Sequence, residues 1–211
     1  MPLPEPAPRE AIHQRHIDCR GYRRADGLWD IEGELRDSKH YPLQMSERGL
    51  LPPGGLVHGL KLRLTIDDDY LIHSVAVASD DTPYAHCKSG VDNYQRLVGL
   101  SIGRGWRRAL RQHLGGAEGC THLVELLGNL ATAAFQTIFP MQGGHLDDDD
   151  SRRPQLLGSC RAFARDSPVV MQRWPRWYRP AAGDTEYDHA QFPNFADTAD
   201  EAGADIAERR A

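Results

Sequence analysis

A strict alternation of apolar and polar residues constrains the fold of this chain more than any other feature. In the clearest stretch, four apolar residues recur at every second position: Leu60, Leu62, Leu64 and Ile66. A period of two is typical of a strand with one buried face. Three aspartates at residues 67–69 favour a turn, and residues 71–79 return with Val75 and Val77 on one face. The pattern predicts a β-hairpin.

The same period occurs earlier in the chain, in residues 27–39, which follow a first structured run over residues 12–24. These two runs are separated by the sequence Ala-Asp-Gly, and an Asp-Gly pair is a strong signal for a tight hairpin turn. We therefore predict a long hairpin whose buried face includes Trp29, Ile31 and Leu35.

Helical spacing replaces the alternation after residue 83. Apolar residues at helical intervals predict helices over residues 83–99, 104–114 and 121–139, the last ended by Pro140 and nearby glycines. The predicted fold class is α+β, with an antiparallel sheet of two or more hairpins packed against a layer of about three helices. A further hairpin is expected over residues 156–174.

Length and composition suggest one folded domain with tails. Of the 211 residues, we assign 1–10 to a disordered lead-in, 11–180 to a single α+β domain and 181–211 to a disordered acidic tail. We predict an acidic loop over residues 145–151, whose sequence lacks the ligand spacing of an EF-hand.

Charge and hydropathy exclude several classes of partner. A formal net charge of −5 provides no basic field for nucleic acid. No apolar run is long enough to span a bilayer, and no secretory signal is visible. Four widely spaced cysteines do not suggest a secreted disulfide framework. We expect a cytoplasmic protein that acts on a small-molecule substrate and could form a homo-oligomer.

The strongest chemical signal is Cys120 and His122 at the start of the third predicted helix. Free N–H groups and the helix dipole favour a thiolate there, which would make Cys120 a better nucleophile or metal ligand. His122 could act as a base or a ligand. Because residues two apart on a helix do not face each other, Cys120 must lie in the entry loop for the two to share a site.

Two further positions could converge on this pair. His58 precedes the clearest strand, and Cys87, next to His86, follows the returning strand. Cysteine and histidine are suitable ligands for zinc, or for iron in sulfur-rich surroundings. We predict a metal site of His58, Cys87, Cys120 and His122, with Cys120 and His122 as the catalytic candidates. For Cys19 and Cys160 we expect burial.

Several segments together resemble a bacterial family, domain of unknown function 2889. They are residues 19–24, 26–33, 62–66 and 119–123, and the similarity covers about residues 10–180. Gly59 stands where this family leads us to expect an aspartate after the histidine.

More distantly, the order of elements from His58 to Ile138 resembles the core of NifU/IscU-type iron–sulfur scaffold proteins. The resemblance places His58 and Cys87 at the positions of two cluster cysteines, and Cys120 with His122 at the position of a His-Cys pair. It implies a NifU/IscU-like core and a metal or iron–sulfur carrier.

Three functions compete. The first is a zinc-dependent hydrolase or lyase acting on a small organic substrate. The second is a non-catalytic metal or iron–sulfur carrier. The third is a thiol enzyme with Cys120 as the nucleophile and His122 or His86 as the base. If none applies, these cysteines and histidines serve packing.

Overall fold

The structure is a computed structural model that describes residues 2–143 and 152–180. The chain divides into two compact units, Met1–His145 and Leu146–Ala211, and each is described by itself. The predicted acidic loop at 145–151 and the predicted tail at 181–211 lie outside the described residues. Residues 2–12 have no secondary structure and are exposed.

The first unit is built on a four-stranded antiparallel sheet with the order β1-β2-β5-β6. Its strands are β1 (His13–Arg23), β2 (Trp29–Lys39), β5 (Leu56–Ile66) and β6 (Ile72–Asp81). Between β2 and β5, the short strands β3 (Leu43–Met45) and β4 (Gly49–Leu51) form a separate two-stranded sheet. Both predicted hairpins are confirmed.

The turn between β1 and β2 shows why Asp-Gly was informative. Gly27 has a φ of 88°, a backbone conformation that costs other residues energy. The carboxylate of Asp26 accepts a hydrogen bond from the Leu28 amide at 3.3 Å. The turn brings Arg23 opposite Trp29 and fixes the register of the whole hairpin.

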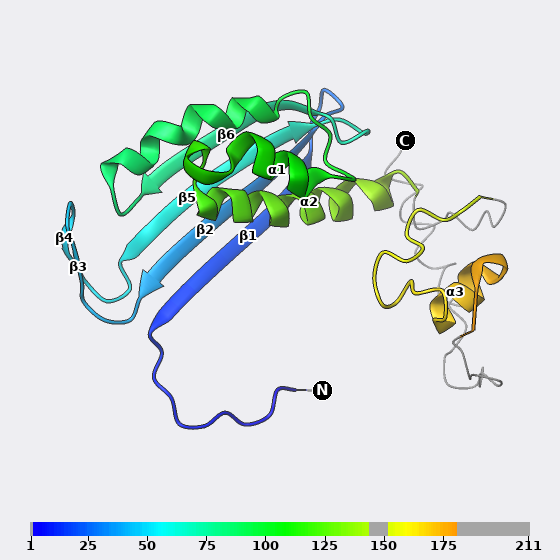
Figure 1. Cartoon of the computed structure of the whole chain (residues 1–211), viewed down its shortest axis with the longest axis horizontal. Coiled ribbons are helices and arrows are strands. Elements are labelled where there is room, and N and C mark those ends of the chain that lie inside the picture. The colour runs from blue at the N-terminus through cyan, green and yellow to red at the C-terminus, as the bar shows by residue number, and fades with distance from the viewer. Residues whose placement is uncertain (1, 144–151, 181–211) are drawn as a thin grey trace. The chain divides into compact units, whose positions relative to one another are not determined.

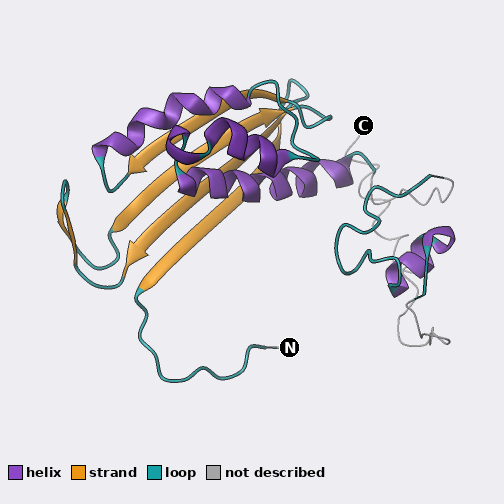
Figure 2. Cartoon of the chain, in the orientation of Figure 1, coloured by secondary structure: helices purple, strands orange, loops and turns teal. Residues whose placement is uncertain are grey.

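Helices cover one face of this sheet, as Figure 2 shows. They are the 3-10 helix η1 (Ala85–Leu97), α1 (Trp106–Leu114), the short 3-10 turn η2 (Gly116–Glu118) and α2 (Thr121–Met141). The α+β class and the three predicted helical segments are confirmed, although the first is a 3-10 helix. Pro140 does not end α2, which continues to Met141. None of the helices in the described ranges is long and apolar enough to cross a membrane.

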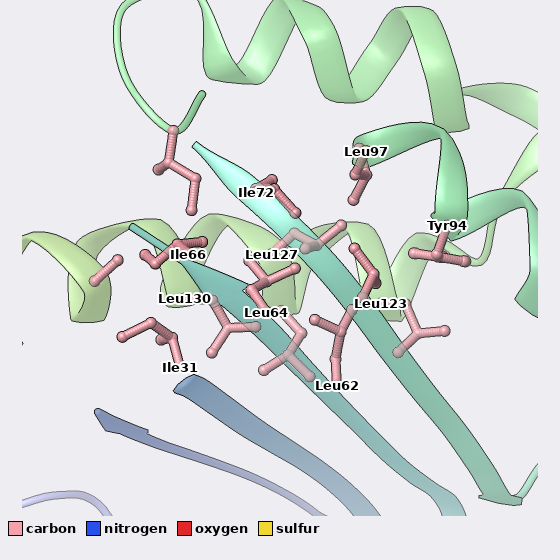
Figure 3. Packing of buried hydrophobic residues seen from close by; sticks show 14 of the residues in the cluster. Ile31, Leu62, Leu64, Ile66, Ile72, Tyr94, Leu97, Leu123, Leu127 and Leu130 are labelled. Carbon is pink, nitrogen blue, oxygen red and sulfur yellow. The ribbon is translucent and has the colours of Figure 1, made fainter. Parts of the chain in front are cut away.

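Helix α2 lies against the sheet and completes the core, contacting β1, β2 and β5 (Figures 1 and 3). Leu127 and Leu130 of α2 are fully buried with Ile31 and Leu64 of the sheet. The helix approaches β1 closely because Gly21 has no side chain: a Cβ there would overlap the side chain of Thr137. This approach brings the first turn of α2 over the ends of the central strands.

The second unit does not contain the predicted hairpin over residues 156–174. Turns lead instead to helix α3 (Pro168–Arg173) and the 3-10 turn η4 (Pro175–Trp177). The hydroxyl of Ser167 accepts from the Val170 amide at 3.2 Å, so Ser-Pro begins a helix here rather than a turn. Cys160 is exposed, which contradicts the prediction that it is buried.

Candidate metal centre

Three residues form a row across the sheet on its helix-covered side. Arg15 of β1 pairs with Asp37 of β2, and Asp37 pairs with His58 of β5. Along β2, Asp37 is the next inward-facing position after Trp29, Ile31 and Leu35. Its exposed fraction is 2%. A carboxylate therefore occupies a position where the alternation calls for an apolar residue.

Asp37 is held by charged and polar partners from both neighbouring strands. Nε of Arg15 donates to Oδ1 of Asp37 at 2.8 Å, and Nη2 of Arg15 donates to Oδ2 at 2.9 Å. Nδ1 of His58 lies 3.0 Å from the same Oδ2. The bidentate pair with Arg15 fixes the plane of the carboxylate, and His58 is aligned against it.

The first turns of α2 bring two more side chains to this row. Nε2 of His122 lies 3.8 Å from Oδ2 of Asp37, and the rings of His58 and His122 have centroids 3.9 Å apart. One turn further along α2, Glu125 accepts a hydrogen bond from Nη1 of Arg15 at 2.6 Å. Arg15 thus connects the carboxylate of the sheet to that of the helix.

Asp37, His58 and His122 form a group suited to a metal ion. One ligand atom from each of the three lies within 4.8 Å of the others. Two imidazoles and one carboxylate are a donor set that proteins use for zinc and for non-haem iron. Each carboxylate oxygen has two lone pairs, and the single hydrogen bond from Arg15 to Oδ1 leaves that oxygen with capacity for an ion.

The surroundings of both histidines favour the neutral form of the imidazole. Burial lowers the pKa of His58, and the nearby His122 lowers it further, although Asp37 opposes the shift. Burial also lowers the pKa of His122, with Arg15 contributing in the same direction. Burial acts to raise the pKa of Asp37, but Arg15 and His58 outweigh it, so the pKa falls. The group therefore contains two neutral imidazoles and an ionised carboxylate, which are the protonation states that bind metal ions.

Cys120 occupies the N-cap of α2 with extended backbone angles, so it lies in the entry to the helix. The Tyr94 hydroxyl holds it there, accepting from the Cys120 amide at 3.0 Å and donating to its carbonyl at 3.3 Å. Its Sγ lies 3.7 Å from Nδ1 of His122. The structure brings Cys120 and His122 together, as the sequence predicted for an entry-loop cysteine.

A pocket of about 400 Å³ adjoins the group. His58, His122 and Cys120 line one part of it, and Cys87 and His86 of η1 line another. Asp37 does not line this pocket, whereas both imidazoles of the group do. Cys87 and Cys120 line the same cavity as His58 and His122 but are not in the group within 4.8 Å, and their roles as metal ligands stay predictions.

Asp37 is the member of the group that sequence reasoning missed. A usable signal was present, because Asp37 has the same parity as the buried positions of its strand. Cys19 is half-buried against the core, and burial raises the pKa of its thiol, which fits a packing role.

Residues 13–136 match the family model described as Protein of unknown function (DUF2889), and the chain belongs to this family. The match lies within the first compact unit and includes Arg15, Asp37, His58 and His122. Neither the curated proteins nor the solved structures contain a significant match to the chain. The comparisons give no support to the resemblance to NifU/IscU scaffolds, and the architecture does not show such a core.

Proposed function

We propose that this DUF2889 protein is a metal-dependent enzyme that binds one divalent ion through Asp37, His58 and His122. Zinc is the first assignment, and the reaction is of the hydrolase or lyase type on a small organic substrate. The observation that carries the proposal is the convergence of the three ligand atoms within 4.8 Å. A three-ligand site leaves coordination positions for water and substrate, as catalytic zinc sites do.

The surroundings support this assignment. Asp37 is fixed by Arg15, so the carboxylate is oriented before an ion arrives. His58 and His122 line the adjoining pocket, so a substrate in the pocket would lie beside two of the residues that would hold the ion. When bound, the ion would polarise a substrate carbonyl or lower the pKa of a water molecule.

Metal analysis of single variants tests the proposal. Protein purified without chelator should contain about one zinc or iron per chain. His58→Ala, His122→Ala and Asp37→Asn should each lose most of that metal. His86→Ala is the matched control, because His86 lines the same pocket outside the ligand group. Equal metal content in all four variants would sink the proposal.

One observation favours a second function, that of a thiol enzyme. Cys120, His122 and Asp37 lie in the order of a nucleophile, a base and an orienting carboxylate. The separations are 3.7 Å from Sγ to Nδ1 and 3.8 Å from Nε2 to Oδ2. Alkylation by iodoacetamide that is prevented by Cys120→Ser, and that abolishes activity with or without chelator, would favour this function.

The iron–sulfur form of the carrier alternative requires sulfur ligands. The group within 4.8 Å contains no thiolate, whereas iron–sulfur clusters are held mainly by cysteines. Cys87 and Cys120 would both have to join His58 for this function. Absorbance of the anaerobically purified protein in the visible region would indicate a cluster, and a colourless zinc protein would exclude the iron–sulfur form of the carrier.

A further inference from the structure

The pocket beside the candidate metal centre has a composition that restricts what can enter it. Its volume of about 400 Å³ lies at the lower end of the ~300–1,000 Å³ typical of small-molecule sites. Its walls come from the first half of β5, the end of β6, η1 and the segment before it, η2, and the start of α2. All of these belong to the first compact unit.

No aspartate, glutamate, lysine or arginine is among the described residues that line this pocket. The ionisable groups on its walls are three histidines, two cysteines and two tyrosines: His58, His86, His122, Cys87, Cys120, Tyr84 and Tyr94. Moving a charged group from water into a cavity without an opposite charge costs free energy. The pocket walls therefore disfavour a substrate that carries a charge.

Three of the six hydroxyl-bearing residues on the walls use their hydroxyls within the protein. Thr82 donates to the Tyr84 carbonyl at 3.0 Å, and Ser89 donates to the His86 carbonyl at 2.8 Å. The Tyr94 hydroxyl is engaged with Cys120. Leu60, Val91 and Leu123 supply apolar wall against which an apolar substrate body can pack.

From this we infer that the substrate is a small uncharged molecule with an apolar body and one hydroxyl or carbonyl oxygen. The body lies against Val91 and the other apolar walls, and the oxygen lies beside His58 and His122. This assignment rests on the proposed function, because the oxygen would meet the ion held there. A Lewis acid acts on such an oxygen by drawing electron density from it.

Three probes of nearly equal size test the inference: benzyl alcohol, benzoate and benzylammonium. Binding to the full chain is measured by calorimetry and by amide chemical shifts, once with chelator and once with zinc. Benzyl alcohol should bind both forms and shift the amides of Cys87 and Val91. In the chelated form, the two charged probes should bind about tenfold more weakly or worse, because their charge is desolvated without a partner.

Two variants in the same region locate the site. Val91→Trp should fill the pocket and weaken benzyl alcohol binding by about tenfold or more. Val98→Trp is the control, because Val98 follows the same helix, is 42% exposed and does not line the pocket. If Val91→Trp does not fold, the shift pattern in the unmodified chain still locates the probe.

Each result has a separate meaning for the two proposals. Equal binding of the three probes to the chelated form, no binding of benzyl alcohol, or shifts far from Cys87 and Val91 would overturn the inference about the substrate. Failure of zinc to bind would overturn the proposed metal function alone, since selection among the probes in the chelated form reports only on the pocket walls.

Discussion

A carboxylate as buried as that of Asp37 is stable only where opposite charge and hydrogen bonds replace water. Arg15 supplies both, through two hydrogen bonds of 2.8 and 2.9 Å. Arg15 also bonds to Glu125 of α2, so one guanidinium joins two strands and a helix. At the scale of single residues, this ion pair is what allows an acidic group to lie beside two neutral histidines.

Replacing Arg15 by glutamine should therefore destabilise the protein. Asp37 would remain buried without its charged partner, and we expect a loss of about 2–4 kcal/mol in the free energy of unfolding. Urea denaturation measures the change. Arg20→Gln is the matched control on the same strand, because its pair with Asp18 is exposed, and its unfolding curve should not move. If Arg15→Gln and Arg20→Gln had the same urea unfolding curve, the role given to Arg15 would be contradicted.

The two histidines predict how stability depends on pH. Their pKa values are lowered in the folded state, so the unfolded chain binds protons first as the pH falls. Stability in the presence of chelator should be complete above the unfolded value of 6.5 and should decrease below it. The slope is at most about 1.4 kcal/mol per pH unit for each histidine.

Urea denaturation at pH 7.5 and 5.5 checks this slope. The double variant His58→Gln, His122→Gln should lose less stability between the two pH values than the unmodified chain. His16→Gln serves as the control, since His16 is exposed on β1 and lies outside the ligand group. A double variant that retains the full pH dependence would show that other groups cause it.

At the scale of elements, the site depends on how closely α2 packs on the sheet. Gly21 and Gly33 leave room for Thr137, Leu126 and Leu130 of the helix. Without these glycines the helix would have to move outward, and His122 and Glu125 at its start would move away from Asp37 and Arg15. The glycines of the strands and the ligands of the site are therefore linked through one helix.

Gly21→Ala should be destabilising by about 1–3 kcal/mol, because its Cβ would overlap Thr137. Thr137→Ala should restore part of the loss, since it removes the two closest atoms, Oγ1 and Cγ2. Gly128→Ala is the control on α2, where a Cβ meets nothing within 4 Å. That variant should be neutral or stabilising, because alanine favours a helix. A destabilised Gly128→Ala beside an unchanged Gly21→Ala would contradict the packing argument.

Elements with strong local patterns could be predicted from the sequence. Both hairpins, α1 and α2 follow from periodicity, an Asp-Gly turn and helix-ending glycines, all of which act over a few residues. Residues 156–174 lack such a period, and Ser167-Pro168 suits a turn and a helix start equally. The site was harder, because Arg15, Asp37 and His58 meet only through strand register. Chain order correctly suggested that His58 and His122 converge, but it cannot give the distance of Cys87 from them.

At the scale of the whole molecule, the candidate centre and its pocket lie within the first compact unit. The main hydrophobic cluster, from Trp29 to Ile138, also lies in that unit. Leu157, Val170 and Trp174 form a separate cluster in the second unit. The expectation of one domain over residues 11–180 stays a prediction, but the metal function needs only the first unit.

A chain that ends at His145 should therefore fold and bind metal with the stoichiometry of the full chain. It keeps the sheet, α2 and every member of the ligand group. Circular dichroism and metal analysis of the shortened and full chains check this expectation. Loss of folding in the shortened chain would mean that the second unit contributes to the stability of the first.

The most direct test of the central claim is the position of the ion in a crystal of the zinc-loaded chain. Anomalous difference maps measured on both sides of the zinc absorption edge locate the metal without reference to the protein coordinates. The account predicts one peak in contact with the Asp37 carboxylate and the imidazoles of His58 and His122, at about 2.0–2.2 Å. No peak at these residues, or a peak held only by other side chains, would contradict it.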